Sequence, residues 1–222
     1  MMLNLFTIFD PATGFVFSFN WISVLVGILF LPLVYWIVPY RSLLVFNSVT
    51  NKLKAEMELL LGVKSLFLII SLISFFFFIV MSNVMGLMPY IFTATSHLSL
   101  TLSLALPMWL GFILYGWVYN TKHMLVHMVP QGTPFVLMPF MVIIESISNI
   151  IRPITLSVRL AANMIAGHLL LALMGGSASV YLMKVSGLIV VGQLVLLVLE
   201  SAVAVIQSYV FVVLMTLYLS EL

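Results

Sequence analysis

Long apolar stretches separated by short polar segments dominate the sequence. An apolar run of about 20 residues can cross the hydrocarbon core of a bilayer as a helix. Five such runs predict five membrane helices, and the last two are long enough to be tilted. The runs occupy residues 14–38, 65–87, 98–119, 135–173 and 187–219, after an N-terminal tail of residues 1–13. We expect Gly175, Gly176 and Ser177 to break the helical pattern between the last two runs.

Residues 40–64, between the first two runs, have a different pattern. Their apolar side chains recur at helical spacing, and Lys52, Lys54, Glu56 and Glu58 avoid that stripe. The stripe consists of Phe46, Val49, Leu53, Met57 and Leu60. Such a pattern is typical of an interfacial amphipathic helix that lies along the membrane surface. The alternative is a solvated loop, because the stripe is short.

Composition supports the same class. Of the 222 residues, 64% are hydrophobic and only 6% are charged, whereas a soluble domain carries roughly a quarter charged residues. A chain so poor in charge cannot cover a water-facing surface, so we predict an all-α polytopic membrane protein that forms a single membrane domain over residues 1–222. The absence of cysteine excludes disulfides, thiolate metal sites and thiol catalysis.

The basic residues predict the orientation in the membrane. With five spans, a group of Lys and Arg residues falls on one side, whereas the N-terminal tail and residues 88–97 on the other side contain none. The group consists of Arg41, Lys52, Lys54, Lys64 and Lys122. The positive-inside rule makes that side the cytoplasm or, in mitochondria, the matrix. We expect the C-terminus on the same side.

Ionisable side chains inside the predicted spans are confined to the last two, and such groups mark ion or substrate pathways. They are Glu145, Arg152, Arg159 and His168 in the fourth span and Glu200 in the fifth, where Gln207 follows one heptad later.

Arg159 stays protonated under physiological conditions, so it can act only as a fixed positive charge. On a helix it shares a face with Ala162, Asn163 and Ala166, and small side chains let another helix approach closely. Glu145 is roughly 21 Å away along the helix axis. We therefore expect the anionic partner of Arg159 on another subunit.

His168 lies on the opposite face, together with Ser157, Ala161 and Met164. Histidine titrates near neutral pH and can take up and release protons. If the last two spans pair antiparallel, Arg159 is level with Gln207 when His168 is nearly level with Glu200. That register requires a connection centred near Met183 and Lys184.

In this register, titratable groups lie on both sides of the permanent cation. His168 and Glu200 are on the outer side and Glu145 is on the inner side. Protons can then enter from either face but cannot pass the arginine directly. A passage blocked in this way needs a carrier, such as a moving carboxylate on a partner.

Structural readings of these residues stay open. His168 and Glu200 can form an interhelical hydrogen-bonded pair without a transport role, and Glu145 can simply pair with Asn149 or Arg152. Arg152 precedes Pro153, where the helix must distort, and we favour a structural role for it. His123 and His127 have a metal-ligand spacing, but no third ligand lies nearby in the sequence, so we favour a solvated interfacial loop.

Two long motifs resemble subunit a of the F-type ATP synthases, and the likeness is greatest to the short mitochondrial versions of animals. LSVRLAANMIAGH at residues 156–168 resembles the arginine-bearing helix of that family, and ESAVAVIQSYVF at residues 200–211 resembles its last helix. NVMGLMPY at residues 83–90 and VPQGTP at residues 129–134 are further matches. The likeness covers essentially the whole chain.

The resemblance implies a proton-translocating stator subunit of the mitochondrial inner membrane that is not catalytic alone. Two offset half-channels would load and unload the carboxylates of a rotating c-ring and so couple proton flow to ATP synthesis. Arg159 would pair with the ring carboxylate, with Gln207 beside it and Asn163 one turn beyond. His168 and Glu200 would line the inlet and Glu145 the matrix-side outlet.

The resemblance also implies the partners of the chain. These are the c-ring, the peripheral-stalk subunit b, small membrane subunits such as subunit 8, protons and lipid. It implies no cofactor, no metal and no nucleic acid.

Two other function classes fit less well. A haem-binding electron-transfer protein needs axial histidines that face each other in a bundle, and only His168 lies deep in a predicted span. A secondary transporter typically shows inverted repeats with interrupted helices in both halves. Here the intramembrane charges lie in one half and no repeat is visible.

Overall fold

A computed structural model describes residues 5–12, 19–32, 38–62, 66–88, 90–129, 134, 137–178 and 183–220, and all regular elements in these ranges are helical. Four helices of this described part are long and apolar enough to cross a membrane: Phe67–Gly86, Leu98–Tyr119, Met138–Ser177 and Gly187–Ser220. The predicted class, an all-α polytopic membrane protein, is confirmed. Parts of the predicted segments lie outside the described residues, namely 1–4, 13–18, 33–37, 63–65 (with Lys64) and 135–136.

The helix predicted for residues 14–38 is shorter where it is described. A 3-10 helix, η2 (Phe19–Ile22), leads into α1 (Ser23–Leu29), and the chain turns at Phe30. The resulting apolar helix, Phe19–Leu29, is shorter than the bilayer core requires. Gly27 lets α1 approach α3 closely, because a Cβ there would lie 3.3 Å from Met81.

The amphipathic segment forms α2 (Arg41–Leu61), so the alternative of a loop is wrong. Leu53 and Met57 of the predicted stripe are buried, and the ring of Phe46 lies 4.4 Å from that of Phe77. Val49 and Leu60 of the stripe are exposed instead. α2 is not among the spanning candidates of the described chain. Its position along the membrane surface stays a prediction.

Two membrane helices coincide with the second and third predicted runs, namely α3 (Leu66–Gly86) and α4 (Leu98–Tyr119). Between them lies a 3-10 turn, η4 (Ala94–Ser96). The serine hydroxyls of α3 donate to carbonyls one turn earlier, as from Ser71 to Leu68 at 2.7 Å. Such bonds satisfy hydroxyl groups within an apolar helix.

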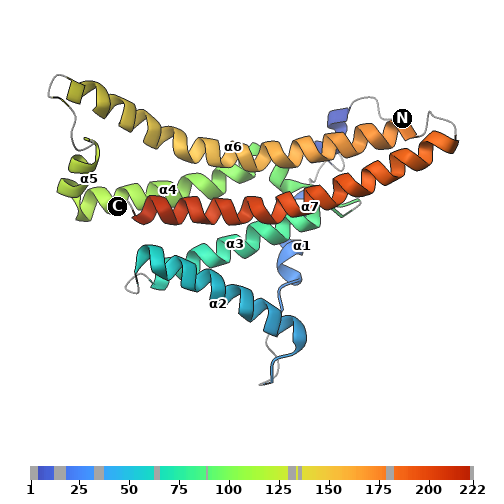
Figure 1. Ribbon diagram of the computed structural model, residues 1–222, viewed down its shortest axis with the longest axis horizontal. Helices are drawn as coiled ribbons and strands as arrows, with labels where there is room; N and C mark the ends of the chain where they lie inside the picture. The colour runs from blue at the N-terminus through green and yellow to red at the C-terminus, as the bar shows by residue number, and fades with distance from the viewer. Residues whose placement is uncertain are drawn as a thin grey trace.

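The last two helices, α6 (Met138–Ala178) and α7 (Met183–Ser220), run antiparallel along the longest dimension of the molecule (Figure 1). The predicted break at Gly175 and Gly176 is wrong, because α6 continues through both. A glycine within a helix destabilises it by only about 0.5–1 kcal/mol relative to alanine, and Gly175 makes room for Gln193 on α7. The connection is also not centred at Met183, since α7 begins there.

The predicted loop that carries His123 and His127 is instead a short helix, α5 (Thr121–His127), with the two rings 6.3 Å apart. No group of three or more His, Asp or Glu side chains in the described ranges is arranged to hold a metal ion.

The hydrophobic core joins α2, α3, α4, α6 and α7. α7 lies between α6 on one side and α2 and α3 on the other, while α4 packs along α6 (Figure 1). The core consists of Leu53, Met57, Ile69, Leu72, Phe76, Ile79, Ala105, Phe112, Leu156, Leu160, Phe211, Val212 and Met215. One polar contact crosses it, because the buried Asn83 amide donates to the Ala204 carbonyl at 3.4 Å. This packing fixes α7 against α6, where the sequence predicts the functional residues.

Candidate functional site

The two faces of α6 have different surroundings. Ser157, Ala161 and Met164 are each at most 3% exposed. Arg159, Ala162 and Ala166 are exposed. The helical spacing in the sequence therefore predicted both faces correctly.

Arg159 projects from the exposed face of α6. No carboxylate of the described residues lies within ion-pair distance of its guanidinium. A guanidinium cannot lose its proton in a protein, and it needs an anionic partner where water is excluded. The exposed alanines around it leave room for a neighbouring helix to approach.

Asn163 and Gln207 connect α6 to α7 one turn beyond Arg159. The Asn163 amide nitrogen donates to the Gln207 side-chain oxygen at 2.9 Å. Gln207 is buried, at 6% exposed, while Asn163 belongs to the exposed face. The pair therefore joins the buried seam between the helices to the surface that carries Arg159.

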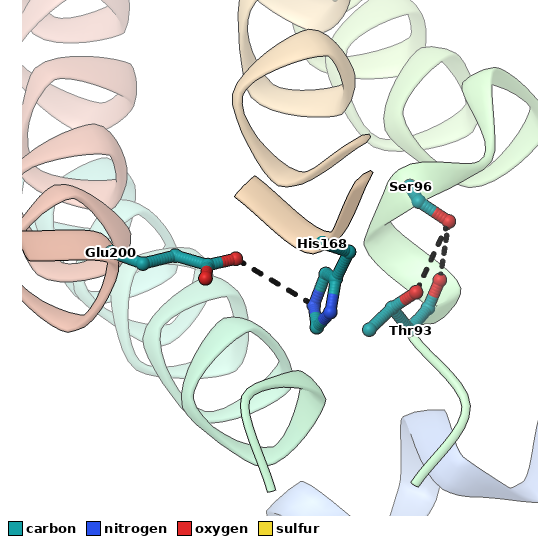
Figure 2. Close-up of polar contacts among 4 residues, drawn as sticks. All are labelled: Thr93, Ser96, His168 and Glu200. Atoms are coloured by element: carbon teal, nitrogen blue, oxygen red, sulfur yellow. Dashed lines mark hydrogen bonds and ion pairs between the residues drawn. The ribbon is translucent and has the colours of Figure 1, made fainter. Parts of the chain in front are cut away.

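His168 and Glu200 face each other across α6 and α7, as Figure 2 shows, with Nε2 of the imidazole 3.8 Å from Oε1 of the carboxylate. Their side chains are 15% and 7% exposed. The pairing predicted from the antiparallel register is present. The distance is longer than a hydrogen bond, and neither carboxylate oxygen has a hydrogen-bond partner among the described residues.

The segment before α4 contributes polar groups that the sequence reasoning missed. Thr93 and Ser96 lie beside the His168 ring (Figure 2), and the Ser96 hydroxyl donates to the Thr93 carbonyl at 2.7 Å. Both residues are buried. The signal in the sequence was the run of small polar residues after the second apolar stretch, but its position beside α6 depends on the tertiary fold.

The N-terminal segment also reaches this site. Phe9, in the 3-10 helix η1 (Leu5–Phe9), presents its ring edge-on to His168 with the centroids 6.5 Å apart. Asp10 follows directly, and its carboxylate accepts a hydrogen bond from the Ala12 amide at 3.0 Å. This tail therefore packs over the His168 side of the site.

His168 and Glu200 line two separate cavities. One of about 520 Å³ is lined by His168, Thr93, Asn20 and neighbouring residues from the N-terminal segment and the loop before α4. A second of about 200 Å³ is lined by Glu200, Asn163 and other residues of α6 and α7. Each member of the pair thus lines a different cavity.

Glu145 pairs with Arg152 in the N-terminal half of α6, at 3.5 Å between Oε1 and Nη2. This is one of the structural readings that the sequence left open. The Arg152 guanidinium also lies over the Tyr218 ring of α7, 5.1 Å from its centroid. Arg152 therefore has a structural contact to both helices, and Glu145 lies far along α6 from the His168–Glu200 pair.

Residues 15–220 match the family described as ATP synthase A chain. The chain belongs to this family. Over its full length it is 57% identical to ATP synthase subunit a of Drosophila melanogaster, of which it covers 99%. It is 54% identical to ATP synthase subunit a of Artemia franciscana, with both chains covered completely, and 53% identical to that of Locusta migratoria, of which 99% is covered.

Membership of the ATP synthase A chain family confirms the resemblance of the sequence motifs. The chain is a subunit of the membrane sector, with a role in proton transport and ATP synthesis, and is not a catalytic subunit. The animal relatives and the four long apolar helices support a multi-pass protein of the mitochondrial inner membrane.

Proposed function

We propose that this chain forms two offset half-channels that load and unload the carboxylates of a rotating c-ring. The observation that carries the proposal is the position of Arg159. It is a permanent cation on an exposed, small-residue face of α6, with titratable groups toward both ends of the same helix. A carboxylate on a neighbouring helix would supply the anion that the described chain does not.

The inlet half-channel begins at the outer cavity and reaches His168 and then Glu200. The imidazole and the carboxylate can each take up and release a proton, Asp10 follows the Phe9 ring that contacts His168, and the hydroxyls of Thr93 and Ser96 can hydrogen-bond to water or to the imidazole. From Glu200 the smaller cavity leads to Asn163, on the same face as Arg159. A proton taken up from the outer side can then load a ring carboxylate beside Arg159.

The outlet half-channel lies on the inner side of Arg159 and uses Glu145. Its side chain is about one quarter exposed, so water can reach it. Arg152 holds this carboxylate in place through their ion pair. Arg159 separates the two half-channels, because its fixed positive charge repels a proton that would cross directly. A ring carboxylate leaves Arg159 only as the neutral, protonated acid or by moving on to the next site. Gln207 and Asn163 hold the two helices together at this point.

The exposed surfaces of the chain and its basic residues suggest its partners and its orientation in the membrane. Besides the c-ring, the exposed apolar faces of α1, α3 and α7 would contact lipid, the peripheral-stalk subunit b and small membrane subunits such as subunit 8. The C-terminus would lie on the matrix side, by the positive-inside rule. Each proton that crosses at 100 mV supplies about 2.3 kcal/mol, so several crossings are needed for each ATP made on other subunits.

Arg159→Ala tests this function in ATP synthase complexes that contain the variant subunit. We expect proton-driven ATP synthesis to be abolished while assembly is retained, because the exposed side chain makes no ion pair with another described residue. Arg41→Ala, on the exposed side of α2, is the control and should synthesise ATP normally. Normal coupled synthesis with Arg159→Ala would reject the proposal.

A further inference from the structure

Gly167 precedes His168 on α6 and lies directly against the Glu200 side chain of α7. A Cβ built at Gly167 would lie 3.0 Å from Cγ and 2.5 Å from Cδ of Glu200, and it would overlap Oε1. Real Cβ atoms essentially never approach other heavy atoms more closely than 3.0 Å. The Glu200 carboxyl group therefore occupies the space that a side chain at position 167 would need.

Other glycines of α6 and α7 do not have this relation. A Cβ at Gly175 would meet the end of the Gln193 side chain at 3.2 Å, and one at Gly192 would meet the terminal methyl of Met174 at 3.2 Å. At each of these positions one side-chain end would have to shift by a few tenths of an ångström, whereas at Gly167 three atoms of the buried Glu200 side chain lie at 3.0 Å or less. A Cβ built at Gly176 would have no described atom within 4 Å outside the backbone of its own helix. Gly167 is thus the position where an added methyl group strikes a buried carboxyl group.

No hydrogen bond from the described residues fixes the orientation of the Glu200 carboxylate. His168 is 3.8 Å away, so the carboxylate must move to receive a proton directly. On its other side, Glu200 lines the small cavity together with Asn163 and Gly167. From the segment before α4, the hydroxyls of Thr93 and Ser96 face the pair and do not titrate near neutral pH. From the N-terminal segment, the ionisable Asp10 follows the Phe9 ring that contacts His168, and its carboxylate accepts a hydrogen bond from the Ala12 amide.

We infer that Gly167 is a positioning residue for proton entry. Because Gly167 has no side chain, the Glu200 carboxylate has room to turn between His168 and the cavity beside Asn163. This inference rests on the proposed function. In the step near His168, the imidazolium Nε2–H bond breaks and an O–H bond forms on Glu200, which leaves both groups neutral. The carboxylic acid then turns past Gly167, and its O–H bond breaks when the proton passes to the carboxylate of the partner ring, which regenerates the Glu200 carboxylate.

Gly167→Ala tests the inference in assembled ATP synthase complexes. We expect proton-driven ATP synthesis and passive proton flux to fall roughly 10–100-fold, since a displacement of a reacting group by about 1 Å can cost on the order of 100-fold. The pH dependence of the flux should change to that of Glu200→Gln. Gly176→Ala, the same substitution on the same helix, should leave rate, pH dependence and assembly unchanged.

A double-variant comparison separates positioning from a purely structural role. If Gly167 acts through Glu200, Gly167→Ala adds no further loss of flux in a Glu200→Gln background, because groups that act as one unit are not additive. An additional loss in that background would overturn the inference. Wild-type flux and wild-type pH dependence in Gly167→Ala would also overturn the inference. If Arg159→Ala is inactive in that same assay, the proposed function stands and only this inference fails.

A third variant covers the case in which Gly167→Ala does not assemble. Glu200→Asp is one methylene shorter and withdraws the carboxylate from the added methyl group. We therefore expect the combination of Gly167→Ala with Glu200→Asp to assemble. Failure of this combination to assemble, while Glu200→Asp alone assembles, would show that backbone packing and not the carboxylate requires the glycine, and would overturn the inference.

Discussion

On one side of α6, Ser157, Ala161 and Met164 are buried against neighbouring segments, while on the other side Arg159 and Ala162 are exposed. The buried side carries a histidine that can exchange protons, and the exposed side carries an arginine that cannot. In the proposed function, a single helix thus separates a site formed within this chain from a site completed by a partner. The following predictions test whether the two sides really differ in this way.

Ala161 and Ala162 are adjacent in the sequence but lie on opposite sides of α6. Ala162→Leu should leave the subunit folded yet abolish coupled ATP synthesis, because the enlarged side chain keeps the partner helix away from Arg159. Ala161→Leu should lower the amount of folded subunit instead, since overpacking a buried position costs about 1–3 kcal/mol. Immunoblots of the membranes and rates of ATP synthesis measure the two effects. Equal loss of folded subunit in both variants would contradict the comparison.

Removal of the imidazole tests the buried side. His168→Ala should slow proton entry roughly tenfold. This loss is smaller than the roughly 10²–10⁴-fold that positioned acid–base groups contribute where proton transfer itself limits the rate. The pH dependence of flux should flatten near neutral pH, where histidine titrates. Proton flux in vesicles at several pH values measures this effect. His123→Ala, on the exposed α5, is the control and should behave like the unaltered chain.

Glu145 and Arg152 allow a test of the inner part of α6. Glu145→Gln should slow proton release several-fold, and Glu145→Gln combined with Arg152→Gln should remain slow, because the titratable group is still absent. If Glu145 serves only as the partner of Arg152, the double variant recovers, since no unpaired charge remains. Rates of ATP synthesis for Glu145→Gln and for the double variant decide between these outcomes.

The smallest effect is expected at an exposed contact away from both sides. The Tyr209 hydroxyl on α7 donates to the Glu56 carboxylate on α2 at 3.1 Å. Tyr209→Phe should change stability by no more than about 0.5 kcal/mol, as surface substitutions usually do, and should leave ATP synthesis unchanged. Thermal inactivation of the complex measures it, with Glu56→Gln as the matching variant. A large loss of activity in either variant would extend the functional site to α2.

Much of the site could be predicted because it follows helical periodicity. The spacing of Arg159, Ala162 and Ala166 depends only on 3.6 residues per turn, as does the assignment of His168 to the other side. The pairing of His168 with Glu200 followed from an antiparallel register. The predicted break at Gly175 was wrong, because local helix propensity is weak and packing against α7 stabilises the helix there.

Other parts of the site could not be predicted from local patterns. Thr93 and Ser96 reach His168 from a loop more than 70 residues earlier in the chain, and Phe9 reaches it from the N-terminal segment. The contact of Arg152 with Tyr218 also depends on how α7 lies against α6. Spacing within one helix carries no information on such contacts.

The sequence by itself determined that this chain is a helical membrane protein, which residues are ionisable inside the spans, and on which side of α6 each lies. These properties follow from the cost of placing charge and unpaired backbone groups in a bilayer and from the period of the helix. Only the tertiary structure decided that Glu200 lies across Gly167. That closeness arises because two helices pack side by side at a distance set by all their contacts, and no single stretch of sequence specifies it.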